Sequence, residues 1–337
     1  MMTPISVLGA GSWGTALALL LARNGHLVML WGHHPQHVAE IESARCNRRY
    51  LPDIPFPDSL HVTASLEQAL AGCRIVLIVV PSHAFRDLLL AIAPHLAFGS
   101  KIAWATKGLE IKTGRLLHEV VTEILSGETP AAVLSGPTFA GEVAANQPTA
   151  ITVASKQGAF AKEMATLLHN NHFRAYTTED LIGVQLGGAT KNVLAIAAGV
   201  ADGLGFGANA RAALITRGLA EMMRFGLALG GKSETFMGLA GVGDLILTCT
   251  DNQSRNRRFG LGLGKGLKRE EVAAQIGQEI EGIATAAVVY RLARSHGVDM
   301  PITEQIYRIL NEGLAPADAV NNLLLREPKP EASIRCD

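Results

Sequence analysis

Short apolar runs alternate with helix-like stretches through the first half of the chain. The runs are rich in β-branched and aliphatic residues and lie at Ile5–Leu8, Leu27–Trp31, Ile75–Val80, Ile102–Thr106, Ala131–Leu134 and Ile151–Ala154. Because they lack polar alternation, we expect strands that are buried on both faces, as in a parallel sheet covered by helices. This pattern predicts an α/β protein with a doubly wound, mainly parallel sheet.

The pattern changes near residue 178. Thr177–Asp180 supplies a capping hydroxyl and an acidic first turn for a helix, and strand-like runs almost disappear after it. Helices are predicted at Leu181–Val200, Ala210–Leu229, Ala284–His296, Thr303–Leu310 and from Pro316, a suitable first-turn proline. We therefore expect an α/β domain over residues 1–178, an all-helical domain over residues 179–326 and a loose tail over residues 327–337.

The composition is that of a globular protein and narrows the choice of partners. Of 337 residues, 48% are hydrophobic and 18% are charged, which excludes a disordered chain. The 30 basic and 30 acidic residues cancel to a net charge of +0. The chain therefore lacks the broad positive field of a protein that binds nucleic acid or an anionic membrane, and a small anion must be held locally.

The cysteines and the apolar runs predict a cytoplasmic protein without membrane insertion. Cys46, Cys73, Cys249 and Cys336 form no C-x-x-C pair, which argues against a metal site and a disulfide scaffold. Cys249 is expected in the core rather than as a reactive thiol. No run reaches the ~18 uninterrupted apolar residues of a membrane span, and the stretch before Arg23 lacks the basic start of a signal peptide.

Gly9, Gly11 and Gly14 fit the pattern G-x-G-x-x-G between the strand Ile5–Leu8 and an expected helix at Trp13–Arg23. The first glycine permits a tight turn, the second lets the backbone approach a pyrophosphate, and the third allows close packing of helix on strand. The phosphates would face the N-terminus of the helix. A purely structural turn is the alternative, but this context favours a Rossmann-type dinucleotide-binding site.

The second strand ends without the acidic residue that usually binds the ribose of NAD. Trp31 is followed by Gly32, His33 and His34. Without a carboxylate a 2′-phosphate is not repelled, and imidazoles can donate hydrogen bonds to it. The sequence therefore permits NADP and mildly favours NADPH, the alternative being two ordinary histidines of a surface loop.

Two lysines are candidates for chemistry. Lys107 follows an apolar strand, at the edge of the sheet where open α/β folds bind ligands, although a lone lysine there is as often turned to solvent. Lys191 shares its helix face with Leu194 and Ala198. Desolvation there would lower the pKa of the amine, as suits a proton donor and acceptor. The alternative is a stem that covers apolar surface while the amine reaches water.

Ser254–Asn256 is a candidate anion site. Arg255 offers a planar fork for a phosphate, and its neighbours can add hydrogen bonds. The alternative is a solvated basic face, which Arg257 and Arg258 continue. Asp244 lies between glycines and an apolar run, where it is able to orient a lysine, bond a substrate hydroxyl or simply cap a helix.

Together these residues closely resemble the bacterial NAD(P)-dependent glycerol-3-phosphate dehydrogenase family. The matching stretches span nearly the whole chain in order: GAGSWGTALA from Gly9, ATKGLE around Lys107, SGPTFAGEV from Ser135, GGATKNVLAIAAG around Lys191, GLAGVGDLILTCT around Asp244, SRNRRFG from Ser254 and EIEG from Glu279. Three places depart from the family pattern, in which arginine is usual near positions 33 and 34, serine at 138 and an aliphatic residue at 279.

The resemblance implies that dihydroxyacetone phosphate is reduced to sn-glycerol 3-phosphate, a phospholipid precursor, with hydride from NAD(P)H. It implies that Lys191 donates the proton in reduction and accepts it in oxidation. Implied substrate contacts are Lys107, Gly136, Thr138, Lys191, Asp244, Ser254, Arg255 and Asn256. Implied cofactor contacts are Gly9, Gly11, Ser12, Trp13, Gly14, His33, His34, Lys107, Ala140, Arg255, Glu279 and Glu281.

Two other functions compete with this one. A related β-hydroxyacid or ketopantoate-type reductase also combines a Rossmann domain and a helical domain with a lysine. The residues Ser254–Asn256 favour a phosphorylated substrate instead. A non-catalytic NAD(P) redox sensor would leave the lysine and the anion site unexplained. The sequence is compatible with a homodimer.

Overall fold

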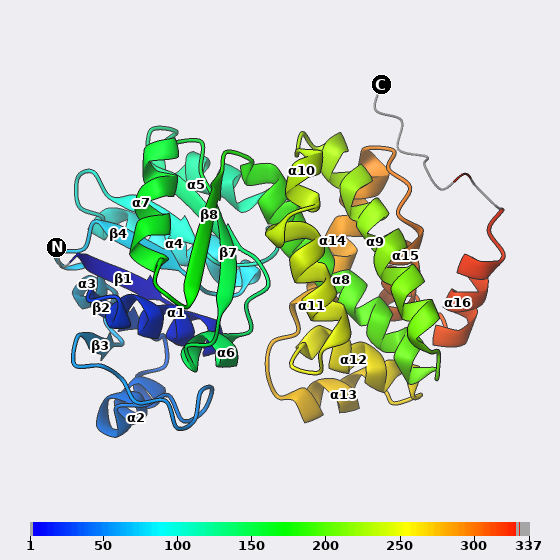
Figure 1. Cartoon of the computed structure of the whole chain (residues 1–337), viewed down its shortest axis with the longest axis horizontal. Coiled ribbons are helices and arrows are strands. Elements are labelled where there is room, and N and C mark those ends of the chain that lie inside the picture. Colours follow the sequence, from blue (N-terminus) through cyan, green and yellow to red (C-terminus); the bar gives the residue numbers. More distant parts are fainter. Residues whose placement is uncertain (1–2, 328–329, 331–337) are drawn as a thin grey trace. The chain divides into compact units, whose positions relative to one another are not determined.

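The computed structural model describes residues 3–327 and residue 330, and the chain forms two compact units (Figure 1). The first, the α/β unit, holds the residues up to Glu110 together with Arg115–Leu181. The second, the helical unit, holds Ile111–Gly114 and the residues from Ile182 onward. A short segment from the first half of the sequence therefore groups with the helices. The tail predicted for residues 327–337 lies mostly outside the described residues.

An eight-stranded sheet forms the centre of the α/β unit, in the order β3-β2-β1-β4-β5-β6-β7-β8. The strands are β1 Pro4–Leu8, β2 Leu27–Trp31, β3 Leu60–Thr63, β4 Ile75–Ile78, β5 Lys101–Trp104, β6 Ala131–Ser135, β7 Thr149–Ala154 and β8 Phe173–Thr178. Neighbouring strands are parallel except β6 and β7. The predicted doubly wound sheet is confirmed, and the strand order reverses at β1 and β4, where such sheets bind ligands.

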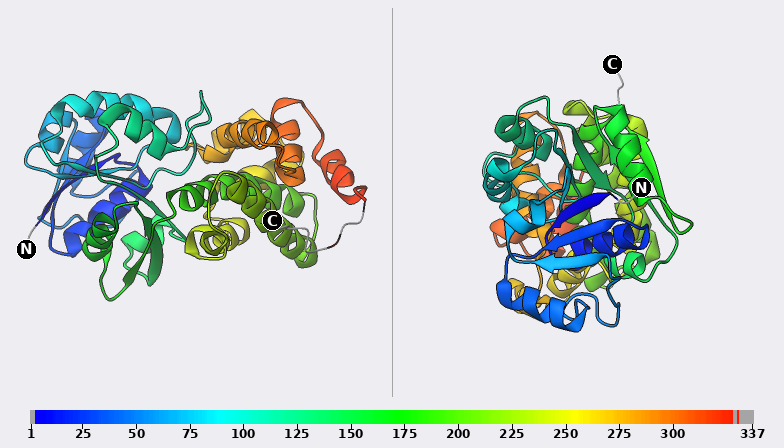
Figure 2. Two further views of the ribbon diagram at one scale, coloured as in Figure 1. Left: turned by 90° about the horizontal axis from the view of Figure 1, so that it is seen from above. Right: turned by 90° about the vertical axis from the view of Figure 1, so that its left-hand side faces the viewer.

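Helices cover both faces of this sheet (Figure 2). They are α1 Ser12–Arg23, α2 Pro35–Ala44, α3 Leu66–Leu70, α4 Ser82–Ile92, α5 Leu117–Leu125, α6 Ala140–Ala144 and α7 Gly158–Leu168, with a 3-10 turn at Ala93–His95. The helix α1 is apolar nearly all round, and its residues from Gly14 to Ala22 are buried. It therefore packs as a core helix directly behind the glycine-rich loop, and this packing fixes the position of that loop.

Two of the eight strands, β3 and β8, were not predicted from the sequence. The strand β8 has a neighbour on one side only, and Phe173 is its one buried residue. Thr177 and Thr178 were predicted to start a helix, which is wrong, because they are the last residues of β8 and the helix begins at Leu181. Thr178 Oγ1 does accept a hydrogen bond from Asp180 N at 3.3 Å, so the hydroxyl stabilises the turn between strand and helix.

The second half of the chain is helical, as predicted. Its elements are α8 Leu181–Gly203, α9 Ala208–Ala228, α10 Ser233–Phe236, a π-helix at Leu239–Gly243, α11 Asp244–Thr250, α12 Arg255–Gly264, α13 Arg269–Ile276, α14 Glu281–Ser295, α15 Pro301–Asn311 and α16 Pro316–Leu324. By length and composition α8 resembles a membrane span, but 94% of its apolar window is buried inside the unit. It is therefore a core helix of this unit, and it packs against α9 and α12.

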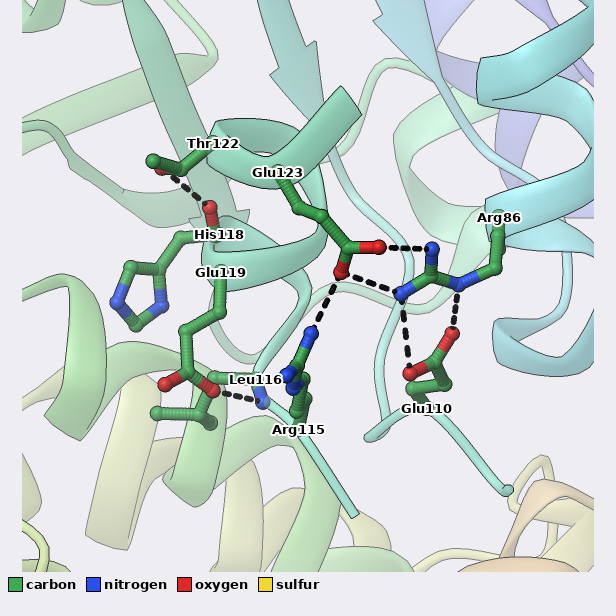
Figure 3. Close-up of polar contacts among 8 residues, drawn as sticks. All are labelled: Arg86, Glu110, Arg115, Leu116, His118, Glu119, Thr122 and Glu123. Atoms are coloured by element: carbon green, nitrogen blue, oxygen red, sulfur yellow. Dashed lines mark hydrogen bonds and ion pairs between the residues drawn. The ribbon is translucent and has the colours of Figure 1, made fainter. Parts of the chain in front are cut away.

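Figure 3 shows a charged network that joins Arg86, Glu110, Arg115 and Glu123. Glu110 and Arg115 directly flank the segment Ile111–Gly114. Both terminal nitrogens of Arg86 donate to Glu123 at 2.9 Å, and its Nε pairs with Glu110. Arg115 Nη1 reaches Glu123 at 2.5 Å, and Glu110 N donates to Arg115 O at 3.0 Å. The two residues that flank the segment are thus held together within the α/β unit.

Candidate active site

The glycine-rich loop after β1 has the shape that its sequence predicts. A Cβ on Gly9, whose φ is +128°, would lie 2.2 Å from Val79 O, and one on Gly14 would lie 1.8 Å from Gly9 O. Neither position accepts a larger residue. A Cβ on Gly11 would meet no atom within 4 Å, so its backbone faces open space where a phosphate group can approach.

The residues of this loop fit a dinucleotide. Gly11 precedes α1 without a side-chain cap, so the first amide groups of the helix are donors for an anion, and Ser12 and Trp13 lie among them. Trp13 Nε1 is buried without a hydrogen-bond partner among the described residues. A buried donor in this state, beside a backbone that is open to an approaching group, is expected where a ligand completes the site.

Asn47 supports this loop and was missed by the sequence analysis. Its amide nitrogen donates to Ala10 O at 3.0 Å and to Thr15 Oγ1 at 2.8 Å, and the residue is fully buried. His37 Nε2 lies 3.1 Å from its oxygen. Nothing in the local pattern marks this asparagine, because its partners lie more than 30 residues earlier in the chain.

His33 and His34 follow β2 at the exposed end of the strand, with ring centroids 3.6 Å apart. Partial desolvation, and then the neighbouring charge of His34, lowers the pKa of His33, although the residue is exposed. His34 also stands directly before α2, whose first residue is Pro35. The imidazoles are therefore exposed hydrogen-bonding groups at the place where a ribose-binding carboxylate usually stands.

The carboxyl ends of β4, β5 and β6 form a continuous polar edge. Thr106 Oγ1 donates to Val80 O at 2.8 Å. Half-buried Lys107 donates from Nζ to Gly136 O at 3.2 Å, and Thr138 Oγ1 donates to the same oxygen at 3.1 Å. Three predicted substrate contacts thus lie together, while Ala140, predicted to contact the cofactor, begins α6 and packs partly buried against the core.

Lys191 is buried in the helical unit and paired with an acid. The residue is 6% exposed, and its Nζ lies 2.6 Å from Asp244 Oδ1 and 2.8 Å from Thr248 Oγ1. Asp244, itself 1% exposed, is the first residue of α11 and directly follows the π-helix. The alternative of an amine that reaches water is therefore wrong. Of the roles considered for Asp244, the structure shows the pairing with a lysine.

The predicted anion residues stand at the start of α12. Ser254 caps this helix, because its Oγ accepts a hydrogen bond from Arg257 N at 3.2 Å. Arg255 is the first helical residue and is half-buried. Asn256 is buried, its Oδ1 accepting from Gly282 N and its Nδ2 donating to Asn192 Oδ1, each at 2.9 Å. Much of the hydrogen-bonding capacity of Asn256 is thus used inside the protein.

Asn192 joins several predicted residues. It follows Lys191 on α8, bonds Asn256 as described, and donates from Nδ2 to Glu281 Oε2 at 3.1 Å. Glu281 begins α14, whereas Glu279 lies exposed before that helix. The neighbour of Lys191 therefore links a predicted substrate residue to a predicted cofactor residue, a link that the sequence analysis missed.

The helices α8 and α12 meet backbone to backbone. A Cβ on Gly199 would lie 2.0 Å from Arg257 O, and one on Gly260 would lie 2.0 Å from Ile196 O. Glycine alone allows such an approach. Since α8 carries Lys191 and α12 begins at Arg255, this contact fixes the amine and the anion residues relative to each other.

The thiol of α11 is inert. Cys249, on α11, is fully buried, and burial raises its pKa to about 12. The thiolate, which is the reactive form, is therefore absent at neutral pH. This agrees with its prediction as a core residue. Among the described residues no three His, Cys, Asp or Glu side chains gather in a metal-binding group.

Known proteins match this chain over nearly its whole length. Sequence models of the NAD-dependent glycerol-3-phosphate dehydrogenase N-terminus and C-terminus match residues 4–161 and 180–321. A glycerol-3-phosphate dehydrogenase (NAD(P)+) of Methylococcus capsulatus is 64% identical over 97% of this chain and 98% of its own. The crystal structure of a glycerol-3-phosphate dehydrogenase from Coxiella burnetii gives a TM-score of 0.94 at 53% identity, over 96% of this chain and 99% of its own.

A ketopantoate reductase from Ralstonia eutropha gives a TM-score of 0.59 at 17% identity, over 95% of this chain and 100% of its own, a likeness of fold alone. The family models and the relatives place the chain among NAD(P)-dependent oxidoreductases that act on a CH–OH group. Within that class the chain belongs to the NAD-dependent glycerol-3-phosphate dehydrogenase family. The predicted resemblance is confirmed, and the ketopantoate-type alternative is not supported.

Proposed function

We propose that Lys191 is the general acid and base with which this enzyme interconverts dihydroxyacetone phosphate and sn-glycerol 3-phosphate. The observation that carries the proposal is the buried pair of Lys191 Nζ and Asp244 Oδ1, 2.6 Å apart. NAD(P)H, when bound, supplies the hydride. Lys191 gives a proton to the carbonyl oxygen as that oxygen gains negative charge, and it takes the proton back in the oxidation direction.

Asp244 and Thr248 keep the amine charged and aimed. A carboxylate in contact favours the protonated lysine, which is the form that reduction needs. Thr248 Oγ1 donates to Asp244 O at 2.6 Å, so its lone pairs are directed at Lys191 Nζ. Proton transfer from a positioned group of this kind contributes a factor of about 10² to 10⁴ in rate.

The start of α12 is the proposed phosphate site. Ser254 Oγ accepts from the helix and keeps its hydroxyl hydrogen for the phosphate. Arg255 makes no ion pair among the described residues, so its guanidinium is available as a fork. Asn256 has a second amide hydrogen beyond the one that Asn192 accepts. The N-terminal end of a ten-residue helix adds a favourable dipole.

The α/β unit holds the main part of the proposed cofactor site. The backbone of Gly9–Gly14 is proposed to hold the pyrophosphate, with Ser12 and Trp13 beside it. His33 and His34 take the place of the usual acid, and this supports a mild preference for NADPH. Further cofactor contacts are proposed for Lys107, Ala140, Arg255, Glu279 and Glu281, and further substrate contacts for Lys107, Gly136, Thr138 and Asp244.

We place the enzyme in the cytoplasm, in the synthesis of a phospholipid precursor. The cysteines that the structure describes, Cys46, Cys73 and Cys249, are free thiols, which suits a reducing compartment.

We also propose a homodimer. Leu324 and Leu325, at the end of α16, are 76% and 83% exposed, and apolar residues of this kind suit burial against a second copy.

The experiment that tests this function follows the loss of reduced-nicotinamide absorbance with two substrates. Dihydroxyacetone phosphate should be reduced with a kcat/KM at least about 10³-fold above that of unphosphorylated dihydroxyacetone, because the phosphate contacts are charge-assisted. NADPH should equal or exceed NADH. Equal use of the two ketones would overturn the assignment of the phosphate site.

A further inference from the structure

Arg257 differs from the rest of the basic run in which it lies. Arg258 is exposed and Arg255 half-buried, whereas Arg257 is 7% exposed. A guanidinium always carries its charge, so it is buried only where acceptors compensate for the lost water. The groups that accept hydrogen bonds from the Arg257 guanidinium therefore indicate its role.

Arg257 bonds three acceptors from three parts of the helical unit. Its Nε donates to Cys249 O, near the end of α11, at 3.0 Å. One terminal nitrogen donates to Asn252 Oδ1, and the other pairs with Asp202 near the end of α8. Arg211 of α9 holds the same carboxylate at 2.9 Å. The charge of Arg257 is thus compensated by groups inside the protein, and its guanidinium is not available to a ligand.

These contacts enclose the turn that carries the anion residues. The turn begins where α11 ends and leads through Asn252 to Ser254. Ser254 N donates to Asp251 O at 3.2 Å, and Ser254 Oγ accepts from Arg257 N at 3.2 Å. Arg257 therefore holds the turn with its side chain at one end and with its backbone at the other.

We propose that Arg257 is a positioning residue that sets the direction in which Ser254 and Arg255 face the substrate phosphate. This proposal rests on the proposed function of the α12 start as the phosphate site. In this proposal Arg257 contacts neither the substrate nor the cofactor. The planar fork is needed because its nitrogens reach a carbonyl, an amide and a carboxylate in fixed directions. The single ammonium of a lysine cannot reach all three.

Four variants separate positioning from general damage. Arg257→Gln removes the fork and Arg257→Lys keeps only the charge. Asn252→Ala removes one contact at an exposed residue, so that the protein keeps its fold. Arg258→Gln is the matched control, since it removes the same charge one residue further along without loss of a buried contact. Each variant is assayed with dihydroxyacetone phosphate and with dihydroxyacetone, and inorganic phosphate is titrated as a competitive inhibitor.

We expect Arg257→Gln to raise the KM for dihydroxyacetone phosphate and the Ki of phosphate about 10- to 100-fold, because small misplacements of binding groups are costly. The kcat/KM for dihydroxyacetone should stay within about twofold, a split between the two ketones that general damage would not give. Arg257→Lys and Asn252→Ala should give smaller changes in the same direction, and Arg258→Gln none.

Equal losses on both ketones in Arg257→Gln would overturn the proposal, as would an unchanged Ki of phosphate. If Arg257→Gln fails to fold, Asn252→Ala and Arg257→Lys decide, and unchanged constants in both overturn the proposal. A parent enzyme that does not prefer the phosphorylated ketone overturns the proposed function and this inference together. A parent with that preference, and variants that keep it in full, overturns the role of Arg257 alone.

Discussion

At the scale of single residues, burial and partners decide what the sequence leaves open. Lys191 was recognisable as a lysine on an apolar helix face, but its spacing fits a solvated amine equally well. Asp244, 53 positions later, resolves the choice by contacting the amine. That contact depends on how α8 packs against α11, which no local pattern encodes.

The residues that sequence reasoning missed have the same explanation. Asn192 and Thr248 are polar residues inside apolar stretches, and Arg257 belongs to a run that suggests an exposed face. Each is identified only by its partner across the fold. A buried polar residue in an apolar helix was the available signal, because such a residue requires a partner.

Substituting Asp244 with asparagine should lower kcat about 10²-fold or more and leave the KM for NADH nearly unchanged. The substitution removes the charge that favours the protonated amine, so the rate of reduction should fall at a lower pH than in the parent. A pH–rate profile measures this. Asp318→Asn, on the exposed face of α16, is the control. An unchanged profile for Asp244→Asn would contradict the role of the carboxylate.

At the scale of elements, length and position decided what could be predicted. The central strands and the long helices carry continuous apolar patterns and were predicted to within a few residues. The edge strand β8 and the short helices between α10 and α13 were missed, because neighbours rather than their own sequence hold such elements in place. The close contact of α8 with α12 left a sequence trace, since it needs glycines on both helices.

The contact between α9 and α15 contains a buried carboxyl group whose protonation affects the stability of the folded chain. Glu221 of α9 accepts hydrogen bonds from Ile302 N at 2.6 Å and from Thr303 N and Oγ1, each at 3.2 Å. The residue is 1% exposed, and burial raises its pKa to about 7 although these bonds oppose the rise. Glu221 therefore binds its proton more tightly in the folded chain than in the unfolded one.

The contribution of Glu221 to the unfolding free energy is highest below its unfolded pKa of about 4.3 and declines until the pH exceeds about 7. Between pH 5 and pH 8 the parent should lose up to about 3 kcal/mol relative to Glu221→Gln. Urea unfolding at both pH values measures this loss, with exposed Glu270→Gln as the control. A parent–variant difference that is the same at both pH values would contradict it.

At the scale of the whole molecule, each of the two units carries its own group of candidate residues. The α/β unit holds the glycine-rich loop and its neighbouring strand ends, and the helical unit holds the buried amine and the start of α12. This division was predictable because the motifs of each unit are local in sequence. The exact partners within each unit were not, because residues far apart in the chain supply them.

The measurement that tests the account most directly separates cofactor binding from turnover in Lys191→Ala. NADH binding is followed by fluorescence, and turnover with dihydroxyacetone phosphate by absorbance. Because Lys191 belongs to the helical unit and is proposed to act on the substrate, the variant should bind NADH within about twofold of the parent and lose at least about 10²-fold in kcat. A variant whose turnover stays within a few-fold of the parent would contradict the assignment of Lys191 as the acid.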